Sequence, residues 1–230
     1  MRQGQRGKQI KESGSTVVQQ EMALRSRKTY GDECFEKWEF VSAGAFGQVC
    51  KARLKDLGID VAIKILHDRY SSSMILRDEA KYMDMASFKF VVSLYGMYQG
   101  CPGKGPSTQQ GIVMEFMEGG SVQSLQEDLG GPPPWPLVFR LAHEVAQGMN
   151  FIHTENLMHQ DLKPSNVLLN DNLNAKIADF GLSRVSASAS NSNKETTGVI
   201  GGSYKYMPPE ALESVSYEPL WYPALDHCYW

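Results

Sequence analysis

The feature that most constrains the fold is a change in the spacing of apolar residues at Gly119–Gly120. Before this point, short runs of β-branched and aromatic residues are separated by glycines, as in strands. Beyond it, apolar residues recur every three to four positions, as in helices. The sequence therefore predicts an α+β protein with a β-rich N-terminal half, a hinge and a mainly helical C-terminal half.

Five runs in the first half have the composition of strands. They cover residues 38–42, 47–53, 61–66, 91–98 and 111–117. Apolar residues at three- and four-residue spacings predict one helix in this half, over 73–87. In the second half, Ser121 is placed to cap a short helix that ends near Gly130, and a longer helix is predicted over 137–153. Two short strands are predicted to follow, at 167–169 and 175–177.

The composition excludes several classes of protein. With 42% hydrophobic residues among 230, the chain is typical of a globular protein. A net charge of −3 gives no reason to expect a nucleic-acid partner. The chain has no run of about 18 uncharged apolar residues, so no membrane span is expected, and residues 1–15 lack the apolar core of a secretory signal. The four cysteines are scattered, which favours free thiols and a cytoplasmic location.

The two ends of the chain differ from its body. Residues 1–33 are basic and rich in glycine, glutamine and serine, so we expect a disordered tail. Residues 214–230 are unusually aromatic and show no helical period, which marks them as an atypical C-terminal tail. Residues 186–203 are rich in serine, threonine and asparagine and favour a mobile loop. The body divides at the hinge into residues 34–117 and 118–213.

A glycine-containing turn and a lysine mark the first half. Residues 42–49, Ser-Ala-Gly-Ala-Phe-Gly-Gln-Val, join two predicted strands. Glycines let a backbone approach phosphate groups closely, although a plain hairpin turn explains the same pattern. Lys64 lies among apolar residues of the next strand, so a buried partner is expected. Glu79 is the predicted partner, because it lies beside the apolar stripe of the helix, where a carboxylate needs a cation, whereas Asp78 is rotated away by about 100 degrees.

The second half contains two polar groups with regular spacing. His159-Gln-Asp-Leu-Lys-Pro-Ser-Asn166 is followed, thirteen residues after Asn166, by Asp179-Phe-Gly. Both groups flank predicted strands, so both can project from one β-turn-β unit. Asp161 could accept or steer a hydroxyl proton, and Lys163 could neutralise a phosphoryl group. Asn166 and Asp179 supply the hard oxygen ligands that Mg²⁺ prefers. The alternative, two unrelated polar loops, would leave the order of these elements unexplained.

Taken in order, these elements resemble the signature motifs of protein kinases. Residues 208–210, Pro-Pro-Glu, complete the set, and the resemblance runs from about Trp38 to Leu212. Residues 111–117, Gly-Ile-Val-Met-Glu-Phe-Met, and the Met-Pro-Pro-Glu that begins at Met207 are similar to the receptor-interacting (RIP) serine/threonine kinases. The resemblance implies a two-lobed kinase fold, with residues 34–117 as the N-lobe and 118–213 as part of the C-lobe.

The resemblance also implies the site residues. The catalytic set would be Lys64, Glu79, Asp161 and Lys163, and Mg²⁺ would be held by Asn166 and Asp179. ATP would be bound by the glycine loop, by the strand that carries the lysine, and by the segment after a gatekeeper methionine. These residues are Val41, Ser42, Ala43, Gly44, Ala45, Phe46, Gly47, Gln48, Val49, Ala62, Lys64, Met114, Glu115 and Met117.

The activity implied is transfer of the γ-phosphoryl group of Mg-ATP to a protein serine or threonine in intracellular signalling of the RIP type, linked to immune, stress or NF-κB-like responses. The implied partners are protein substrates, signalling adaptors or receptors, and a second kinase domain in a dimer. Tyrosine specificity is less expected, because Lys163-Pro-Ser-Asn166 matches the serine/threonine form of the catalytic loop.

Three departures from the family pattern temper this expectation. Ser42 replaces the first glycine of the loop, and Gln160 replaces an arginine that in many kinases receives an activation-loop phosphate. After Glu213, the helices that should complete the C-lobe have no counterpart. We therefore expect a chain that keeps its catalytic residues but folds poorly or works weakly. The alternative function is a catalytically weak or inactive truncated kinase that acts as a nucleotide-binding or interfering signalling module.

Overall fold

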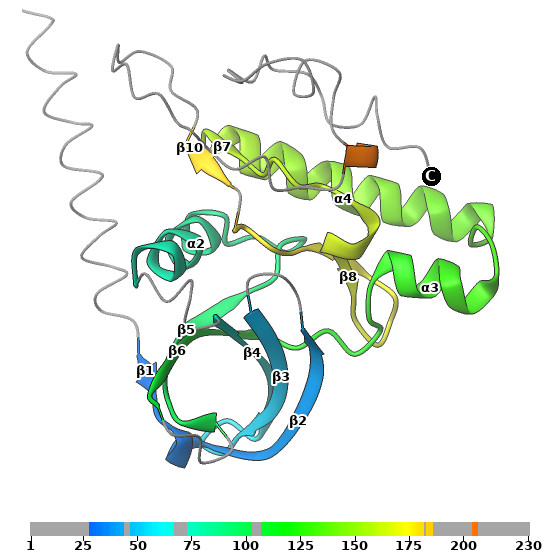
Figure 1. Ribbon diagram of the computed structural model, residues 1–230. Coiled ribbons are helices and arrows are strands. Elements are labelled where there is room, and N and C mark those ends of the chain that lie inside the picture. The colour runs from blue at the N-terminus through cyan, green and yellow to red at the C-terminus, as the bar shows by residue number, and fades with distance from the viewer. Residues whose placement is uncertain are drawn as a thin grey trace, which may run out of the picture. The chain divides into compact units, whose positions relative to one another are not determined.

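The computed structural model describes residues 28–43, 47–66, 73–102, 107–181, 183–185 and 204–206. The chain divides into two compact units, each drawn in Figure 1. The first comprises Met1–Asp84 and Leu94–Glu115, and the second Met85–Ser93 and Phe116–Trp230. The predicted loop at 186–203, the aromatic tail at 214–230 and the motif at 208–210 lie outside the described residues. The domain boundaries inferred from the sequence remain predictions.

The first unit is built on a six-stranded sheet with the order β1-β5-β6-β4-β3-β2. Its strands are β1 (Thr29–Tyr30), β2 (Phe35–Ala43), β3 (Gly47–Leu54), β4 (Ile59–Leu66), β5 (Leu94–Gly100) and β6 (Gln109–Glu115). All neighbouring strands are antiparallel except β1 and β5, which are parallel. A short 3-10 helix, η1 (Asp32–Cys34), precedes β2, and one α-helix, α2 (Ser73–Met85), follows β4. Figure 1 shows the sheet strongly curved.

The alternation along β4 decides where its lysine lies. Successive side chains of a strand point to opposite faces of the sheet. Val61, Ile63 and Ile65 belong to the hydrophobic core of this unit, together with residues of the neighbouring strands. Lys64 therefore projects from the opposite face of β4, where α2 supplies its partner.

The predicted disordered tail, residues 1–33, is wrong for its last residues. Thr29 and Tyr30 form β1, which pairs with Met97 and Tyr98 of β5. The Tyr30 ring is buried, and its centroid lies 5.8 Å from that of Phe35. A strand of two residues is too short to show alternation, so its sequence gives no sign of the pairing.

The second unit contains the remaining described helices and two short strand pairs. The helices are α3 (Val122–Leu129), α4 (Trp135–Thr154), and the 3-10 turns η4 (Pro164–Asn166) and η5 (Tyr204–Tyr206). The strands are β7 (Leu157–Met158), β8 (Val167–Leu169), β9 (Ala175–Ile177) and β10 (Arg184–Val185). β8 pairs with β9, and β7 pairs with β10, both antiparallel. β8 and β9 match the two predicted strands.

Helix α3 begins and ends where the sequence indicates. The Ser121 hydroxyl oxygen accepts the backbone N–H of Ser124 at 3.0 Å, which caps the first turn. Gly130 ends the helix with φ of 65°, the left-handed conformation that glycine adopts without a steric penalty. The predicted cap and the predicted end are both confirmed.

Helix α4 buries one stripe and leaves apolar side chains exposed at its start. Its buried residues include Leu141, Val145 and Ile152, at helical spacing. Trp135 and Phe139 are 71% and 68% exposed, so the first turns of this helix present apolar side chains to solvent. Within the described residues, no helix is long and apolar enough to cross a membrane. The predicted α+β class, with a β-rich first half that carries one helix and a mainly helical second half, is confirmed.

Candidate active site

In the first unit, Lys64 and Glu79 form the predicted ion pair. The Lys64 Nζ lies 2.7 Å from Glu79 Oε1, and their side chains are 17% and 3% exposed. β4 supplies the lysine and α2 supplies the glutamate. Asp78 is exposed, as its rotation around the helix requires. The pair therefore places an oriented ammonium group at a part of the unit largely withdrawn from water.

Neighbouring strands bring further predicted nucleotide-binding residues close to Lys64. Val49 of β3 and Ile112 of β6 lie opposite Lys64 in the register of the sheet. Two positions earlier along β4, Ala62 lies opposite Met114, the predicted gatekeeper, and both are buried. A strand position two residues away points to the same face, so Lys64, Ala62 and their cross-strand neighbours line one face of the sheet.

The glycine loop is described only at its two ends. Val41, Ser42 and Ala43 end β2 and are exposed, while residues 44–46 lie outside the described residues. Gly47 begins β3, and a Cβ atom there would lie 2.1 Å from the Ile65 carbonyl oxygen. Backbone packing by itself therefore requires glycine at 47.

The remaining predicted nucleotide-binding residues lie on β3 and at the end of β6. Gln48 is half-buried on β3, and Glu115 is the half-buried last residue of β6. Met117 is buried and belongs to the second unit. Their role towards a nucleotide remains a prediction.

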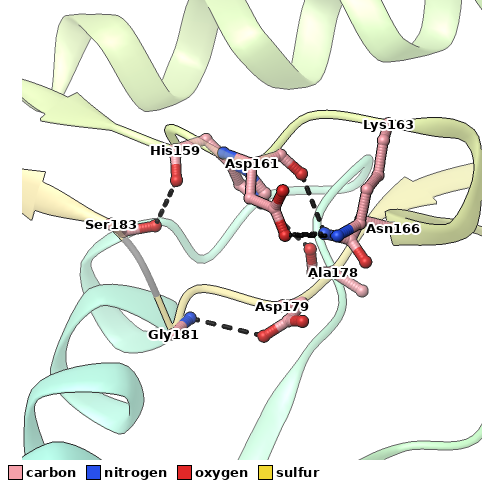
Figure 2. Close-up of polar contacts among 8 residues, drawn as sticks. All are labelled: His159, Asp161, Lys163, Asn166, Ala178, Asp179, Gly181 and Ser183. Atoms are coloured by element: carbon pink, nitrogen blue, oxygen red, sulfur yellow. Dashed lines mark hydrogen bonds and ion pairs between the residues drawn. The ribbon is translucent and has the colours of Figure 1, made fainter. Parts of the chain in front are cut away.

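In the second unit, a polar network fixes the carboxylate of Asp161 (Figure 2). The Lys163 Nζ donates to Asp161 Oδ2 at 2.7 Å. The Asn166 amide nitrogen donates to the same oxygen at 2.9 Å and to the Asp161 backbone oxygen at 2.8 Å. The turn η4 brings Asn166 close to Asp161, because the Asn166 backbone N–H donates to the Lys163 carbonyl at 2.9 Å and reverses the chain direction. Asp161 is thereby held in one orientation by two donors.

Asn166 and Asp179 are placed at the two ends of one hairpin. Asn166 directly precedes β8, and Asp179 lies two residues beyond β9. The Ala178 N–H donates to the Asn166 carbonyl at 2.9 Å, which joins the two ends. Both N–H groups of the Asn166 amide point at Asp161, so its carbonyl oxygen is turned away from Asp161. An amide oxygen and a carboxylate are hard donors, and these two residues therefore fit Mg²⁺ by their chemistry.

Two residues of this region have a strained backbone. Gln160 and Asp179 have φ of 64° and 65°, in the left-handed region. Such conformations cost about 1–3 kcal/mol for residues other than glycine and are frequent at functional sites. They lie immediately before Asp161 and at the end of the hairpin.

His159 is a structural member of the site to which the sequence pattern assigned no role. It is buried, its Nε2–H donates to the Ala178 carbonyl at 2.9 Å, and its Nδ1 accepts the Asp161 N–H at 3.3 Å. The ring packs edge-on against Phe180, with centroids 5.1 Å apart. The Ser183 hydroxyl donates to the His159 carbonyl at 3.3 Å (Figure 2). His159 thus ties the segment of Asp161 to the segment of Asp179.

The pKa of His159 predicts how stability depends on pH. Burial lowers this pKa from 6.5; Ala178, Asp179 and Asp161 oppose the shift, and Lys163 adds to it. The unfolded chain therefore binds a proton at a higher pH than the folded chain, so stability falls as the pH drops below 6.5. Replacing His159 with glutamine should reduce this loss, measured as the melting temperature between pH 7.5 and 5.5.

The control for this experiment is His143→Gln, which makes the same substitution at an exposed side chain of α4. The slope of this variant should differ from that of the parent by less than the slope of His159→Gln does. Burial also lowers the pKa of His153, which is half-buried on α4, so we expect this residue to contribute to the pH dependence that His159→Gln retains. An equal slope in His159→Gln and in the parent would contradict the prediction.

Comparisons with known proteins agree with the motifs. A family model described as protein tyrosine and serine/threonine kinase matches residues 35–219. Receptor-interacting serine/threonine-protein kinase 4 of Mus musculus is 38% identical over 199 residues, which cover 84% of this chain and 24% of that protein. Receptor-interacting serine/threonine-protein kinase 3 of Rattus norvegicus is 38% identical over 189 residues, which cover 80% of this chain and 37% of that protein.

A third relative gives the same result. Receptor-interacting serine/threonine-protein kinase 2 of Bos taurus is 38% identical over 186 residues, which cover 76% of this chain and 33% of that protein. The chain spans about a quarter to a little over a third of the length of these curated relatives.

Proposed function

Because the chain belongs to the protein tyrosine and serine/threonine kinase family, we propose that it transfers the γ-phosphoryl group of ATP to the hydroxyl group of a protein serine or threonine. The resemblance to RIP kinases inferred from the motifs is confirmed, as is the kinase-like fold class. Kinases in general use ATP together with Mg²⁺. The following assignments to individual residues are part of the proposal.

The observation that carries the proposal is the network around Asp161. Its carboxylate is 11% exposed and is held by Lys163 and Asn166 on one oxygen, Oδ2. Its other oxygen, Oδ1, would accept or steer the proton of the substrate hydroxyl group. Such a proton transfer requires a fixed base within hydrogen-bond reach of that hydroxyl. Lys163 supplies a positive charge beside this base, suited to a phosphoryl group that carries negative charge.

The residues of the first unit are assigned to the nucleotide. Lys64, oriented by Glu79, contacts the α- and β-phosphates. The loop of residues 42–49 covers the phosphates, since its glycines let the backbone approach them. The face that carries Ala62 and Met114 contacts the adenine, because these apolar residues lie on the same side of the sheet as Lys64.

Asn166 and Asp179 are assigned to magnesium. The ion would neutralise charge on the phosphates when bound. Asn166 would supply an uncharged oxygen whose direction is set by its two bonds to Asp161, and Asp179, which follows the second strand of the same hairpin, would supply a carboxylate. The two residues would thus hold the ion from one small structural unit.

The proposed setting is cytoplasmic signalling of the RIP type, with protein substrates, adaptors or receptors, and a second kinase domain as partners. This part rests on the names of the relatives, which are serine/threonine kinases. The specificity for serine or threonine rests on the same names and on Lys163-Pro-Ser-Asn166, which matches the serine/threonine form of the catalytic loop.

Removing the metal should abolish transfer. We expect the purified chain to label serine- and threonine-containing peptides from radiolabelled ATP, with label lost on chelation by EDTA and restored by excess Mg²⁺. Peptides that differ only in having tyrosine at the acceptor position serve as the control and should stay unlabelled. Transfer to tyrosine, or transfer that survives EDTA, would overturn the proposal. Nucleotide binding without transfer would instead support the nucleotide-binding module.

A further inference from the structure

One stripe of helix α4 runs along strand β9. Arg140, Glu144 and Gly148 are four residues apart and therefore lie on one face of the helix. Each contacts the hairpin of β8 and β9 at a successive position, from its turn to the last residue of β9. Asn166 precedes the first strand of the hairpin and Asp179 follows the second, so both lie at its open end. The contacts of this stripe thus act on the part of the chain that holds both proposed magnesium ligands.

The first contact is at the turn of the hairpin. Arg140 Nη2 donates to the Leu173 carbonyl at 3.0 Å and to the Asn172 carbonyl at 3.4 Å. The turn is also closed from within, because Asn170 Oδ1 accepts the N–H groups of Asn172 and Asn174 at 3.0 and 2.9 Å. The turn of the hairpin is therefore held both by its own hydrogen bonds and by Arg140 of the helix.

The second contact is buried and charged. Glu144 Oε2 accepts the backbone N–H of Ala175 at 2.6 Å. Glu144 is 8% exposed and Ala175 is fully buried. A buried N–H group without an acceptor costs free energy, so the Glu144 carboxylate stabilises the fold by accepting the N–H of Ala175, the first residue of β9. The hydrogen bond also fixes which residue of β9 lies opposite Glu144.

The third contact is the closest approach of helix and strand. A Cβ atom at Gly148 would lie 2.8 Å from Ile177 Cδ1 and 2.9 Å from the Phe90 carbonyl oxygen. Only glycine leaves room for this approach without a shift of backbone atoms. Four residues of helix advance by about 6.0 Å, and two residues of strand by about 6.6 Å. The steps from Arg140 to Glu144 to Gly148 therefore match the steps from 173 to 175 to 177.

We propose that Glu144 is a positioning residue that fixes the register of β9 on α4 and so holds Asp179 and Asn166 where they bind magnesium. A slip of β9 along the helix would move Asp179, which is two residues beyond its end, and would strain the bond between Ala178 N–H and the Asn166 carbonyl. This inference rests on the proposed function for the role of the two ligands, and on the contacts of the second unit for the register.

The test compares two substitutions of Glu144. Glutamine keeps an acceptor oxygen for the Ala175 N–H, whereas leucine of similar size removes it. In Glu144→Leu, amide hydrogen exchange of residues 167–178 should become faster in the nucleotide-free chain, and the Mg²⁺ concentration for half-maximal ATP binding should rise about 10–100-fold. Glu144→Gln should stay close to the parent in both measurements.

Val145→Ala is the matched control, because it trims a buried residue of the same helix that lies about 100° round the helix from Glu144 and is not part of the stripe. It should lower the melting temperature without changing the Mg²⁺ midpoint. Equal exchange rates in Glu144→Leu and Glu144→Gln would overturn the register role. Faster exchange in Glu144→Leu with an unchanged Mg²⁺ midpoint would overturn the positioning role. If the parent chain binds no Mg-ATP, the proposed function and the positioning role both fail, while the exchange rates still report on the register.

Discussion

Replacing Lys64 with methionine is expected to lower the free energy of unfolding by about 3–5 kcal/mol, as when one partner of a buried ion pair is removed. The reason is the environment of Glu79, whose carboxylate is 3% exposed and loses a cation that lies 2.7 Å away. Phosphoryl transfer should fall by at least about 100-fold, because the group that positions the phosphates is gone. Urea unfolding and the peptide-labelling assay measure the two effects.

A double substitution separates the effect on stability from the effect on activity. Apolar residues of similar volume can replace both members of a buried ion pair at little cost, so Lys64→Met with Glu79→Leu should regain most of the lost stability. It should not regain activity. Lys55→Met is the control, since Lys55 is exposed in the turn between β3 and β4 and should shift stability by no more than about 0.5 kcal/mol. Full activity in the stable double variant would show that this lysine does not act on the nucleotide.

The parts of the fold that follow from local pattern could be predicted. β8 and β9 have the expected bounds, and α2 begins at the expected residue, because strand and helix periods are properties of short stretches. The Lys64–Glu79 pair could also be predicted, because a carboxylate beside the apolar stripe of a helix needs a cation as partner. These features needed no knowledge of distant segments.

The parts that depend on distant partners could not be predicted. The apolar run at 91–98 was expected to be one strand, but β5 begins at Leu94. Val91 forms a bridge with Ile177, and the Val92 N–H donates to the Ile177 carbonyl at 2.9 Å, so these two valines belong to the second unit. Nothing in the sequence distinguishes a valine that pairs in the sheet from one that pairs with β9.

In the candidate site, too, some features follow from local sequence and others depend on distant partners. The types and spacing of its polar residues were apparent from the sequence, because the chemistry requires a base, cations and oxygen ligands. The buried contacts that support them were not, since His159 bonds to Ala178 and Glu144 to Ala175, partners 19 and 31 residues away. Such contacts depend on how α4, the hairpin and the loop pack, which no local period encodes.

Replacing Asp161 with asparagine should lower kcat by about 10²–10⁴-fold, the usual contribution of a general base. The amide oxygen can still accept the bonds of Lys163 and Asn166, which lie 2.7 and 2.9 Å from Oδ2, so the loop keeps its shape. The carboxylate that takes or steers the hydroxyl proton is lost. KM for ATP should change little, because Asp161 is assigned to the acceptor and not to the nucleotide.

A steady-state assay with peptide substrate, run below the melting temperature of the variant, measures this effect. Asp128→Asn makes the same chemical change at an exposed residue of α3 and should leave kcat unaltered. If Asp161→Asn retained more than about a tenth of the parental kcat, the proton-steering role would be wrong. If kcat were retained while KM for ATP rose, Asp161 would be acting on the nucleotide, and the division of labour between the two units proposed above would have to be redrawn.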